Sequence, residues 1–253
     1  MSRWDAGALA AALGIPVVAH EVVDSTMMAA EADPRPRVVH LAGRQRSGQG
    51  RHGRLWSSPP GNLYATIAWT AEERLPPAVL SAIQVAWCEA VAGAGGPRTA
   101  CKWPNDGLVA GGKWAGLLAR RSDGPEGGRL LVGLGANLER APSPEELGPD
   151  AAPAAALADH WRPWPGRSAV GRLLLAAAVD VLREGSAGMV ERLARWPIHD
   201  ALEVGARVRI EDAAGERTGL YRGLAPDGRL RLATERSEIL VSAGDVRRVR
   251  PIT

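Results

Sequence analysis

The sequence predicts an α+β fold, in which a mixed, mainly antiparallel sheet with flanking helices precedes a small C-terminal β-barrel. Apolar runs on either side of Gly111-Gly112 indicate a β-hairpin. The apolar segment 75–94 has a helical period that suits burial against a sheet. Beyond Val204, short alternating segments with glycine turns predict a separate set of five strands. We therefore expect two domains, residues 1–200 and residues 201–253.

Length and composition narrow the class of protein. A chain of 253 residues can bury a core, and its net charge of +3 is too small and too scattered to suggest a nucleic-acid binder. Cys88 and Cys101 have neither metal nor redox spacing, so a reducing cytoplasm is the expected compartment. Gly14 and Pro16 interrupt the apolar stretch 6–19, and no run reaches membrane-spanning length, so no membrane association is expected.

Caps, breakers and periodicity predict the elements in chain order. Ser2 is expected to cap a helix over Arg3–Leu13 that ends at Gly14, and Ser168 a helix that runs to Arg183. Between them we expect strands over 16–23, 37–41, 62–69, 99–101, 108–109, 113–118 and 129–135, helices over 27–32 and 75–94, and a long connection over 141–165. A helix over 189–196 and strands over 207–211, 217–224, 229–233, 238–241 and 246–249 follow.

The segment Gly43–Trp56 has a composition that an ordinary loop does not need. It holds four glycines, four arginines and two glutamines between two expected strands. Glycines let backbone N–H groups approach a ligand, and arginine binds carboxylate or phosphate through two parallel hydrogen bonds. The segment therefore favours a mobile anion-binding flap. A solvated, arginine-rich surface loop is the alternative, because the spacing is not that of a strict phosphate loop.

Two lysines mark a second candidate region. Lysine and arginine together number 31, of which Lys102 and Lys113 are the two lysines. Lysine is a compact point charge on a flexible stem, so a site that needs such a charge would resist replacement by arginine. Chance survival of the two lysines is the alternative.

The segment between these lysines adds polar residues. Pro104 cannot donate to a β-ladder, so Asn105 and Asp106 are expected on a bend at a strand end. The hairpin then brings this bend, with Lys102, close to Lys113. Asn-Asp after proline is also ordinary turn chemistry, but its coincidence with both lysines favours a site.

The turn Asp24-Ser25-Thr26 lies where an expected strand leads into a helix. Small hydroxyls at this position cap the helix, or they bind a ligand held near its N-terminus. The residues alone leave both interpretations open.

The absence of several well-known motifs argues against the reaction classes that depend on them. The sequence has no GxxxxGK[ST] loop, no GxSxG elbow and no His/Cys cluster of metal spacing, so no protein-bound metal is expected. An anion clamp beside a charged site suits activation of a carboxylate by ATP, where charge must be neutralised at phosphorus. Lys113, Arg51 and Arg54 are the candidates for this neutralisation, with Mg²⁺.

Four segments, in the same order along the chain, resemble the motifs of the biotin protein ligase family. They span residues 16–140, and the tail is similar to the small SH3-like C-terminal domain of that family. The combination is far more specific than any one motif. The segments are Gln45–Trp56 (GRGRxGRxW), Lys102–Asp106 with Lys113 and Gly116 (KWPND…K..G), Asp24–Thr26 (DST(N)) and Gly133–Asn137 (GxGxN).

The resemblance implies a class II synthetase/biotin ligase-like fold and a two-step reaction. Biotin and MgATP would give biotinyl-5′-AMP and pyrophosphate. The lysine amine of a biotin carboxyl carrier domain would then attack the mixed anhydride and release AMP. ATP and biotin are the implied substrates, Mg²⁺ the implied cofactor and the carrier domain the implied partner, while a homodimer is left open.

The resemblance also implies residue roles. Lys113 and Arg51 would be catalytic, and Asp106 would orient the acceptor lysine. The implied biotin site comprises Ser25, Thr26, Met27, Gln45, Gln49, Gly50, Arg51 and Lys113. The implied ATP or adenylate site comprises Gly48, Arg51, Arg54, Trp56, Asn105 and Asn137.

Two residues depart from the family pattern. Gln49 stands where the loop usually has arginine, which removes one cation from the clamp. Met27 follows Ser-Thr where asparagine is usual, and loss of a buried hydrogen bond costs on the order of 1–3 kcal/mol. Both departures bear on affinity, and Met27 also bears on substrate identity.

Three rival functions remain. A lipoate or octanoate ligase or transferase shares the architecture, but such an enzyme is not expected to carry this flap with Trp56. A biotin-responsive repressor would need a DNA-binding domain before the first helix, where we see no room, so no DNA partner is expected. An RNA-binding barrel would need an aromatic platform, and residues 204–253 offer only Tyr221.

Overall fold

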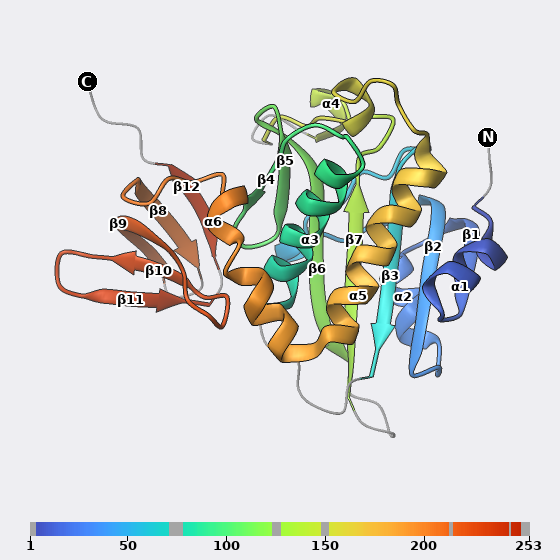
Figure 1. The fold of residues 1–253 in the computed structure, drawn as a ribbon, viewed down its shortest axis with the longest axis horizontal. Coiled ribbons are helices and arrows are strands. Elements are labelled where there is room, and N and C mark those ends of the chain that lie inside the picture. Colours follow the sequence, from blue (N-terminus) through green and yellow to red (C-terminus); the bar gives the residue numbers. More distant parts are fainter. Residues whose placement is uncertain are drawn as a thin grey trace.

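A seven-stranded sheet forms the centre of the computed structural model, which describes residues 4–70, 78–122, 128–147, 152–212, 215–242 and 244–248 (Figure 1). Its strands are β1 (Val17–Val23), β2 (Arg37–Gln45), β3 (Leu63–Trp69), β4 (Thr99–Lys102), β5 (Asp106–Val109), β6 (Gly112–Ser122) and β7 (Arg129–Ala136). They lie in the order β1-β2-β3-β7-β6-β5-β4. β1 and β2 are parallel and every other neighbouring pair is antiparallel, which confirms the predicted fold class.

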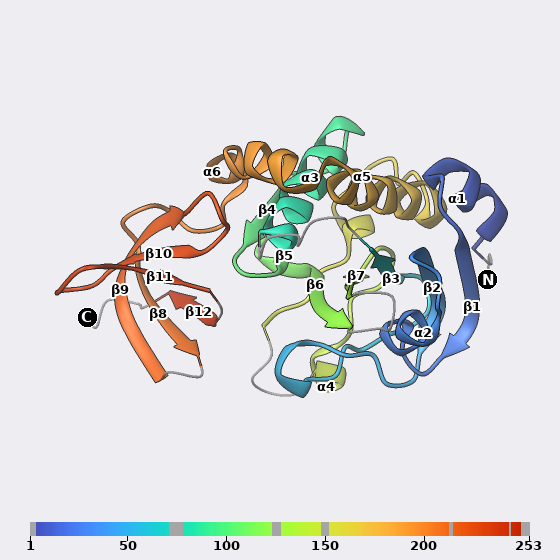
Figure 2. The ribbon, with the colours of Figure 1, turned by 90° about the horizontal axis from the view of Figure 1, so that it is seen from below.

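Helices cover both faces of this sheet. Those described are α1 (Ala6–Leu13), α2 (Thr26–Ala32), α3 (Val79–Gly93), α4 (Pro144–Leu147), α5 (Arg167–Leu193) and α6 (Trp196–His199). Figure 2 shows α1, α3 and α5 along one face and α2 on the opposite face. Trp87 of α3 joins this helix layer to the sheet, because its Nε1 donates to the carbonyl of Leu174 at 2.8 Å and its ring lies 5.6 Å from that of Trp114. Among the described residues, no helix has the length and apolar character needed to cross a membrane.

The first helix begins later than predicted. The expected cap, Ser2, lies outside the described residues, and α1 starts at Ala6, where the carboxylate of Asp5 accepts from the N–H of Ala8 at 2.9 Å. Asp5 explains the late start, because a capping carboxylate at this position begins the helix at Ala6, and Trp4 before it is buried in the core. The predicted end is confirmed: Gly14 has a φ of 62°, the left-handed conformation that glycine adopts readily.

The long helix α5 also differs from its prediction at one end. Gly166, and not Ser168, is its N-cap residue, and no side chain caps it. The start is held instead by Arg167, whose guanidinium lies 4.6 Å from the centroid of the Trp4 ring. A break at Gly185, with φ 66° and ψ −160°, separates α5 into two helical parts, in agreement with the two helices predicted here. Trp196 was predicted to end the second of these helices, but it begins the separate helix α6.

Two strand boundaries near the candidate site differ from the predicted ones. The tight turn of the predicted hairpin is Ala110-Gly111, with φ values of 48° and 81°, and Gly112 already belongs to β6. Positive φ at both central residues matches the right-handed twist of the paired strands. β2 runs to Gln45, beyond the predicted end at Leu41, so the flap begins within a strand of the sheet.

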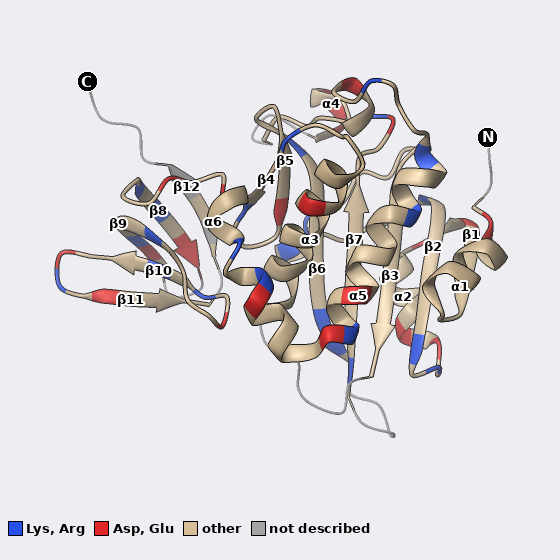
Figure 3. Ribbon diagram, in the orientation of Figure 1, with Lys and Arg blue, Asp and Glu red and all other residues tan. Residues whose placement is uncertain are grey.

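The C-terminal residues form a second sheet, and its five predicted strands are confirmed. Its strands are β8 (Arg207–Asp212), β9 (Gly215–Leu224), β10 (Leu230–Ala233), β11 (Glu238–Val241) and β12 (Asp245–Arg248), in the order β11-β10-β9-β8-β12. Their apolar side chains share one cluster with Cys101, Trp103 and Trp196 of the preceding chain. The indole of Trp103 donates to the carbonyl of Gly228 at 3.0 Å, which ties this sheet to the end of β4. Figure 3 shows β3 and most of β7 tan, whereas acidic and basic residues lie mainly on the helices, at strand ends and in the second sheet.

Candidate active site

The flap is a β-hairpin whose base is closed by backbone hydrogen bonds. Trp56 N donates to Gly48 O at 2.9 Å, and Gly50 N donates to Arg54 O at 2.7 Å. Gln49 and Leu55 form an antiparallel bridge between the two arms. The tip is a single 3₁₀ turn over Arg51–Gly53. The segment that composition singled out therefore projects from β2, with Arg51 in the tip turn and Arg54 directly after it, while Arg44 and Arg46 lie at the end of β2.

Hydroxyl and amide side chains gather where the flap leaves the sheet. The carbonyl oxygen of Gln45 accepts from Thr26 N at 2.9 Å and from Thr26 Oγ1 at 3.0 Å. Thr66 of β3 donates to Thr26 Oγ1 at 2.9 Å, and Gln45 Nε2 donates to Ser58 Oγ at 3.1 Å. Ser25 caps α2 by accepting from Met27 N at 3.2 Å. Thr26 and Gln45 were predicted, whereas Thr66 and Ser58 were missed because isolated hydroxyls carry no spacing signal.

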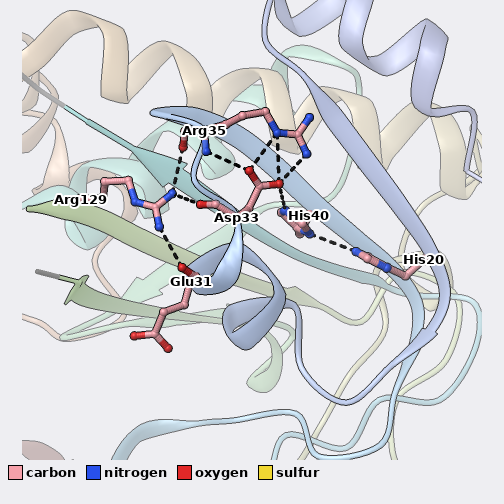
Figure 4. Close-up of polar contacts among 6 residues, drawn as sticks. All are labelled: His20, Glu31, Asp33, Arg35, His40 and Arg129. Atoms are coloured by element: carbon pink, nitrogen blue, oxygen red, sulfur yellow. Dashed lines mark hydrogen bonds and ion pairs between the residues drawn. The ribbon is translucent and has the colours of Figure 1, made fainter. Parts of the chain in front are cut away.

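The far end of α2 is held by a second polar cluster (Figure 4). Asp33 ends the helix, and its carboxylate accepts from Arg35 Nε at 2.9 Å and contacts His40 Nε2 at 2.9 Å. His40 Nδ1 in turn lies 3.0 Å from His20 Nε2. Arg129 of β7 donates to the carbonyls of Glu31 and Arg35, both at 2.9 Å. These contacts fix α2, and with it the position of Thr26 at its first turn.

Two glycines on neighbouring strands form a flat floor at the centre of the site. Gly116 of β6 and Gly135 of β7 are register partners, and a Cβ on either would lie 2.6 Å from the Trp56 ring. Trp56 therefore rests flat on this floor, and its Nε1 is buried without a partner among the described residues. Next to it, a Cβ on Gly133 would lie 2.8 Å from Met27 Cε.

Met27 belongs to the apolar packing beneath α2 as well as to this floor. Its side chain is 4% exposed and clusters with Ala30, Val38, Ala68 and Leu131. The methyl group that reaches Gly133 is thus the end of a core side chain. A polar residue at this position would be buried among apolar neighbours.

Lys113 and Asp106 meet across the β5–β6 hairpin. Nζ of Lys113 lies 2.7 Å from Oδ1 of Asp106, in an ionic contact without the alignment of a hydrogen bond. The same Nζ lies 5.3 Å from the centroid of the Trp56 ring. Lys102 is the backbone register partner of Asp106 on the neighbouring strand β4, so it lies beside Asp106 on the side away from β6.

The backbone around Lys113 is held from both sides. Its N–H donates to Pro153 O at 2.7 Å, and its carbonyl accepts from Ala155 N at 3.0 Å. Asn137 Nδ2 also donates to that carbonyl, at 3.3 Å, while its Oδ1 is buried without a partner among the described residues. Asn137 thus lies beside the backbone of Lys113.

Arg51 links the flap tip to two other parts of the chain. Its Nη1 donates to Asn105 Oδ1 at 3.4 Å and to the carbonyl of Gly244 in the second sheet at 3.2 Å. Asn105 is buried and donates through Nδ2 to Leu117 O at 2.7 Å. Arg54 is exposed on the second arm of the flap.

The predicted residues therefore form two groups that meet at Trp56. One group is the polar cluster of Thr26 and Gln45, and the other contains Lys113, Asp106, Asn105 and Arg51. Nothing among the described residues groups three His, Cys, Asp or Glu side chains in a way that could hold a metal. The arrangement suits an elongated ligand with a polar head and an anionic end.

Comparison with known proteins points to one family. Residues 19–137 match the Biotin/lipoate A/B protein ligase family. The chain is 32% identical over 218 residues to the biotin--[acetyl-CoA-carboxylase] ligase of Mycobacterium tuberculosis, and this alignment covers 83% of this chain and 78% of that protein. It is 42% identical over 118 residues to the ligase of the same name from Paracoccus denitrificans, across 45% of this chain and 49% of that protein.

Solved structures show the same fold. The biotin protein ligase of Aquifex aeolicus in complex with biotin and ATP superposes with a TM-score of 0.78 at 24% identity, covering 92% of this chain and 99% of that one. A mutant of that ligase in complex with biotin gives a TM-score of 0.78 at 26% identity, covering 92% and 98%. The likeness therefore extends through both sheets.

Proposed function

The chain belongs to the biotin/lipoate A/B protein ligase family, and from this premise we propose that it is a biotin–[acetyl-CoA-carboxylase] ligase. It activates biotin with ATP to give biotinyl-5′-AMP and pyrophosphate. It then transfers the biotinyl group to a lysine of a biotin carboxyl carrier domain. Curated ligases of this name are 32% and 42% identical to the chain over the segments that align.

One geometric observation carries the proposal. The Thr26–Gln45 cluster and the Lys113–Asp106 pair lie on either side of a tryptophan that rests on a glycine floor. The ureido head of biotin has one carbonyl and two N–H groups, which the hydroxyl and amide groups of the cluster complement. Its apolar body suits the exposed side of the Trp56 ring, and its carboxylate suits the lysine. The biotin site so proposed comprises Ser25, Thr26, Met27, Gln45, Gln49, Gly50, Arg51 and Lys113.

In the first step a carboxylate oxygen of biotin attacks the α-phosphorus of ATP, and the bond to pyrophosphate breaks. Both reactants are anionic, so the protein must hold them together and neutralise charge at phosphorus. We assign this task to Lys113, which the hairpin already positions, and to Arg51, which the flap tip carries. Gly48, Arg54, Trp56, Asn105 and Asn137 are the proposed contacts of the nucleotide.

In the second step a lysine amine of the carrier attacks the carbonyl carbon of the mixed anhydride. AMP leaves with the bonding electrons, and the amine loses a proton. Asp106 is the carboxylate closest to Lys113, at 2.7 Å, so it is suited to orient an incoming ammonium or amine at that point. We propose this orienting role for Asp106.

Magnesium enters the proposal only with the nucleotide. Mg²⁺ keeps several waters and is commonly bound through substrate phosphates, with one or two carboxylates at most. We propose that the ion is carried by the phosphates of ATP. Such an ion would add positive charge at the β- and γ-phosphates.

The wider setting is also a proposal. We propose that residues 1–200 form the catalytic unit and residues 201–253 an SH3-like unit, and that the protein works in the cytoplasm. Cys88 and Cys101 are buried free thiols whose Sγ atoms lie 3.6 Å apart, and a reducing compartment would keep them reduced. The partner is the carrier domain of a biotin-dependent carboxylase, and a monomer and a homodimer are both compatible with the site.

A binding experiment separates biotin from its nearest rival. Isothermal calorimetry of biotin and of lipoate, each with a non-hydrolysable ATP analogue, should show tight binding of biotin and at least about a 100-fold preference over lipoate, a difference of about 2.7 kcal/mol. Biotin-dependent ATP–pyrophosphate exchange should accompany it. Preference for lipoate, with exchange that depends on lipoate, would replace the proposal by a lipoate ligase.

A further inference from the structure

The base of the flap is a crowded junction of four residues. A Cβ on Gly48 would lie 2.6 Å from the carbonyl oxygen of Trp56, and 2.9 Å from both Gln45 Nε2 and Ser58 Oγ. Only glycine fits such a space, because a real Cβ does not approach other heavy atoms so closely. Because residue 48 is a glycine, the Thr26–Gln45 cluster and the flap are in direct contact.

Ser58 occupies the centre of this junction. Its Oγ accepts from Gln45 Nε2 at 3.1 Å and donates to the carbonyl of Trp56 at 3.0 Å. A hydroxyl has one donor and two acceptor positions, so a single side chain serves both neighbours. Ser58 is 7% exposed, which leaves water little access to replace either bond.

The two partners of Ser58 belong to different parts of the site. Gln45 holds Thr26 through its carbonyl oxygen, at the end where the head group would bind. Trp56 lies on the glycine floor beside Lys113, at the end where the acyl carbon would react. Ser58 is the side chain that joins them by hydrogen bonds.

We propose that Ser58 is a positioning residue that couples occupation of the Thr26–Gln45 cluster to closure of the flap. The inference rests on the proposed function for the identity of the ligand, biotin. A head group that engages Gln45 fixes the orientation of its amide, and Ser58 passes that constraint to the Trp56 carbonyl. The hairpin base, which the hydrogen bond from Trp56 N to Gly48 O closes, then holds the Trp56 ring in place beside the ligand.

Nothing in the contacts of Ser58 makes it a nucleophile. The hydrogen bonds of its hydroxyl run to an amide and a backbone carbonyl, neither of which takes a proton from it. Nucleophilic serine needs an adjacent general base within hydrogen-bond reach. The role of Ser58 is therefore exerted through Gln45 and Trp56.

Steady-state kinetics of Ser58→Ala test the coupling. We expect KM for biotin to rise about tenfold, in line with loss of a buried hydrogen bond, while KM for ATP stays within about twofold. Ser57→Ala, one residue earlier and outside the junction, is the matched control and should behave as wild type. An unchanged KM for biotin in Ser58→Ala, in a folded protein, would overturn the proposal.

A double-mutant cycle shows whether Ser58 acts through Gln45. If it does, Gln45→Ala combined with Ser58→Ala should be no worse than Gln45→Ala alone, within about twofold. Independent losses that multiply in the double variant would contradict the coupling. Should Ser58→Ala fail to fold, Ser58→Cys, which keeps a weak donor and acceptor, takes its place in the cycle.

Amide hydrogen exchange measures the junction without any ligand. The amides of Gly50 and Trp56 should exchange about tenfold faster in Ser58→Ala than in wild type, because local opening of the hairpin becomes easier. Ser57→Ala should leave both rates unchanged. Equal rates in all three proteins would refute the structural coupling, whereas absence of biotin activity in the wild type would refute only the proposed function.

Discussion

Lys113 and Asp106 face each other across the β5–β6 hairpin, with Nζ 2.7 Å from Oδ1. The tight turn at Ala110-Gly111 fixes their separation, so both charges are in place before a ligand arrives. Their side chains are 29% and 22% exposed, and an ion pair that is open to solvent contributes little to stability. We therefore connect this pair with the reaction and not with the fold.

Lys113→Ala should reduce formation of biotinyl-adenylate by about 100- to 1,000-fold, the range found when one preorganised charge-stabilising group is removed. Biotin-dependent ATP–pyrophosphate exchange measures this step. Arg120→Ala, on the same strand and in an exposed ion pair with Glu31, is the control and should retain full exchange. Near-normal exchange in Lys113→Ala, with an unchanged Tm, would remove the lysine from its assigned role.

Asp106→Asn should separate the two steps of the reaction. Asparagine keeps the shape of the side chain but loses the charge that would orient the acceptor amine. We expect exchange to stay within about threefold of wild type, and transfer from preformed adenylate to the carrier to fall about tenfold or more, as for loss of one hydrogen bond to a charged group. Single-turnover transfer measures the second step. Equal losses in both steps would show that Asp106 acts through Lys113 alone.

The cluster at the end of α2 predicts a pH dependence of stability. Burial lowers the pKa of His40 below its ordinary value of 6.5, against the opposing effect of Asp33. The unfolded chain therefore binds more protons than the folded chain once the pH falls below about 6.5, and stability decreases with acidification. Asp33 stays ionised in this range because the hydrogen bond from Arg35 lowers the pKa of its carboxyl.

His40→Gln should weaken this dependence, because glutamine does not titrate. Chemical denaturation at pH 7 and pH 5 gives the change in unfolding free energy for each protein. His199, whose pKa burial also lowers, is present in both proteins, so the difference between them reports on the cluster of His20, Asp33, Arg35 and His40. Identical slopes in wild type and variant would place the pH dependence elsewhere.

The sequence predicted most of this architecture because its signals were local. The β5–β6 hairpin followed from Gly111 and Gly112, and the strands of the second sheet from alternation and glycine turns. The cap of α1 was predicted at Ser2, although Asp5, which is also a favoured N-cap residue, is the residue that caps it. The start of α5 was predicted wrongly because its N-cap residue, Gly166, has no capping side chain that the sequence could have signalled.

The candidate site divides in the same way. Lys113 and Asp106 were predicted to lie close together because both flank a short hairpin. Ser58 and Thr66 were missed, since their hydroxyls gain meaning only from contacts with Gln45 and Thr26 that fold topology creates. The contact of the Trp56 ring with Gly116 and Gly135 likewise depends on the pairing of β6 with β7, which sequence spacing does not reveal.

Gly135→Ala should disturb binding through Trp56. The added Cβ would lie 2.6 Å from Trp56 Cε2, so the ring must leave the floor and the flap must shift with it. We expect KM for biotin to rise about tenfold or more, equivalent to at least about 1.4 kcal/mol. Gly93→Ala is the matched control, because a Cβ there meets nothing within 4 Å. Wild-type KM in Gly135→Ala would mean that the floor is not part of the biotin site.

Gln49→Arg should tighten the hold of the flap on the adenylate. Gln49 is exposed and is paired with Leu55 only as a β-bridge, so a longer side chain leaves the hairpin intact. An added cation near an anionic ligand should slow release of biotinyl-adenylate by about three- to tenfold at low salt, and less at 0.5 M salt, where the Debye length is only about 4 Å. Gln49→Met, similar in size but uncharged, is the control, and stopped-flow release of the adenylate is the measurement. A slowing in both variants, or one that salt does not reduce, would assign the effect to packing and not to charge.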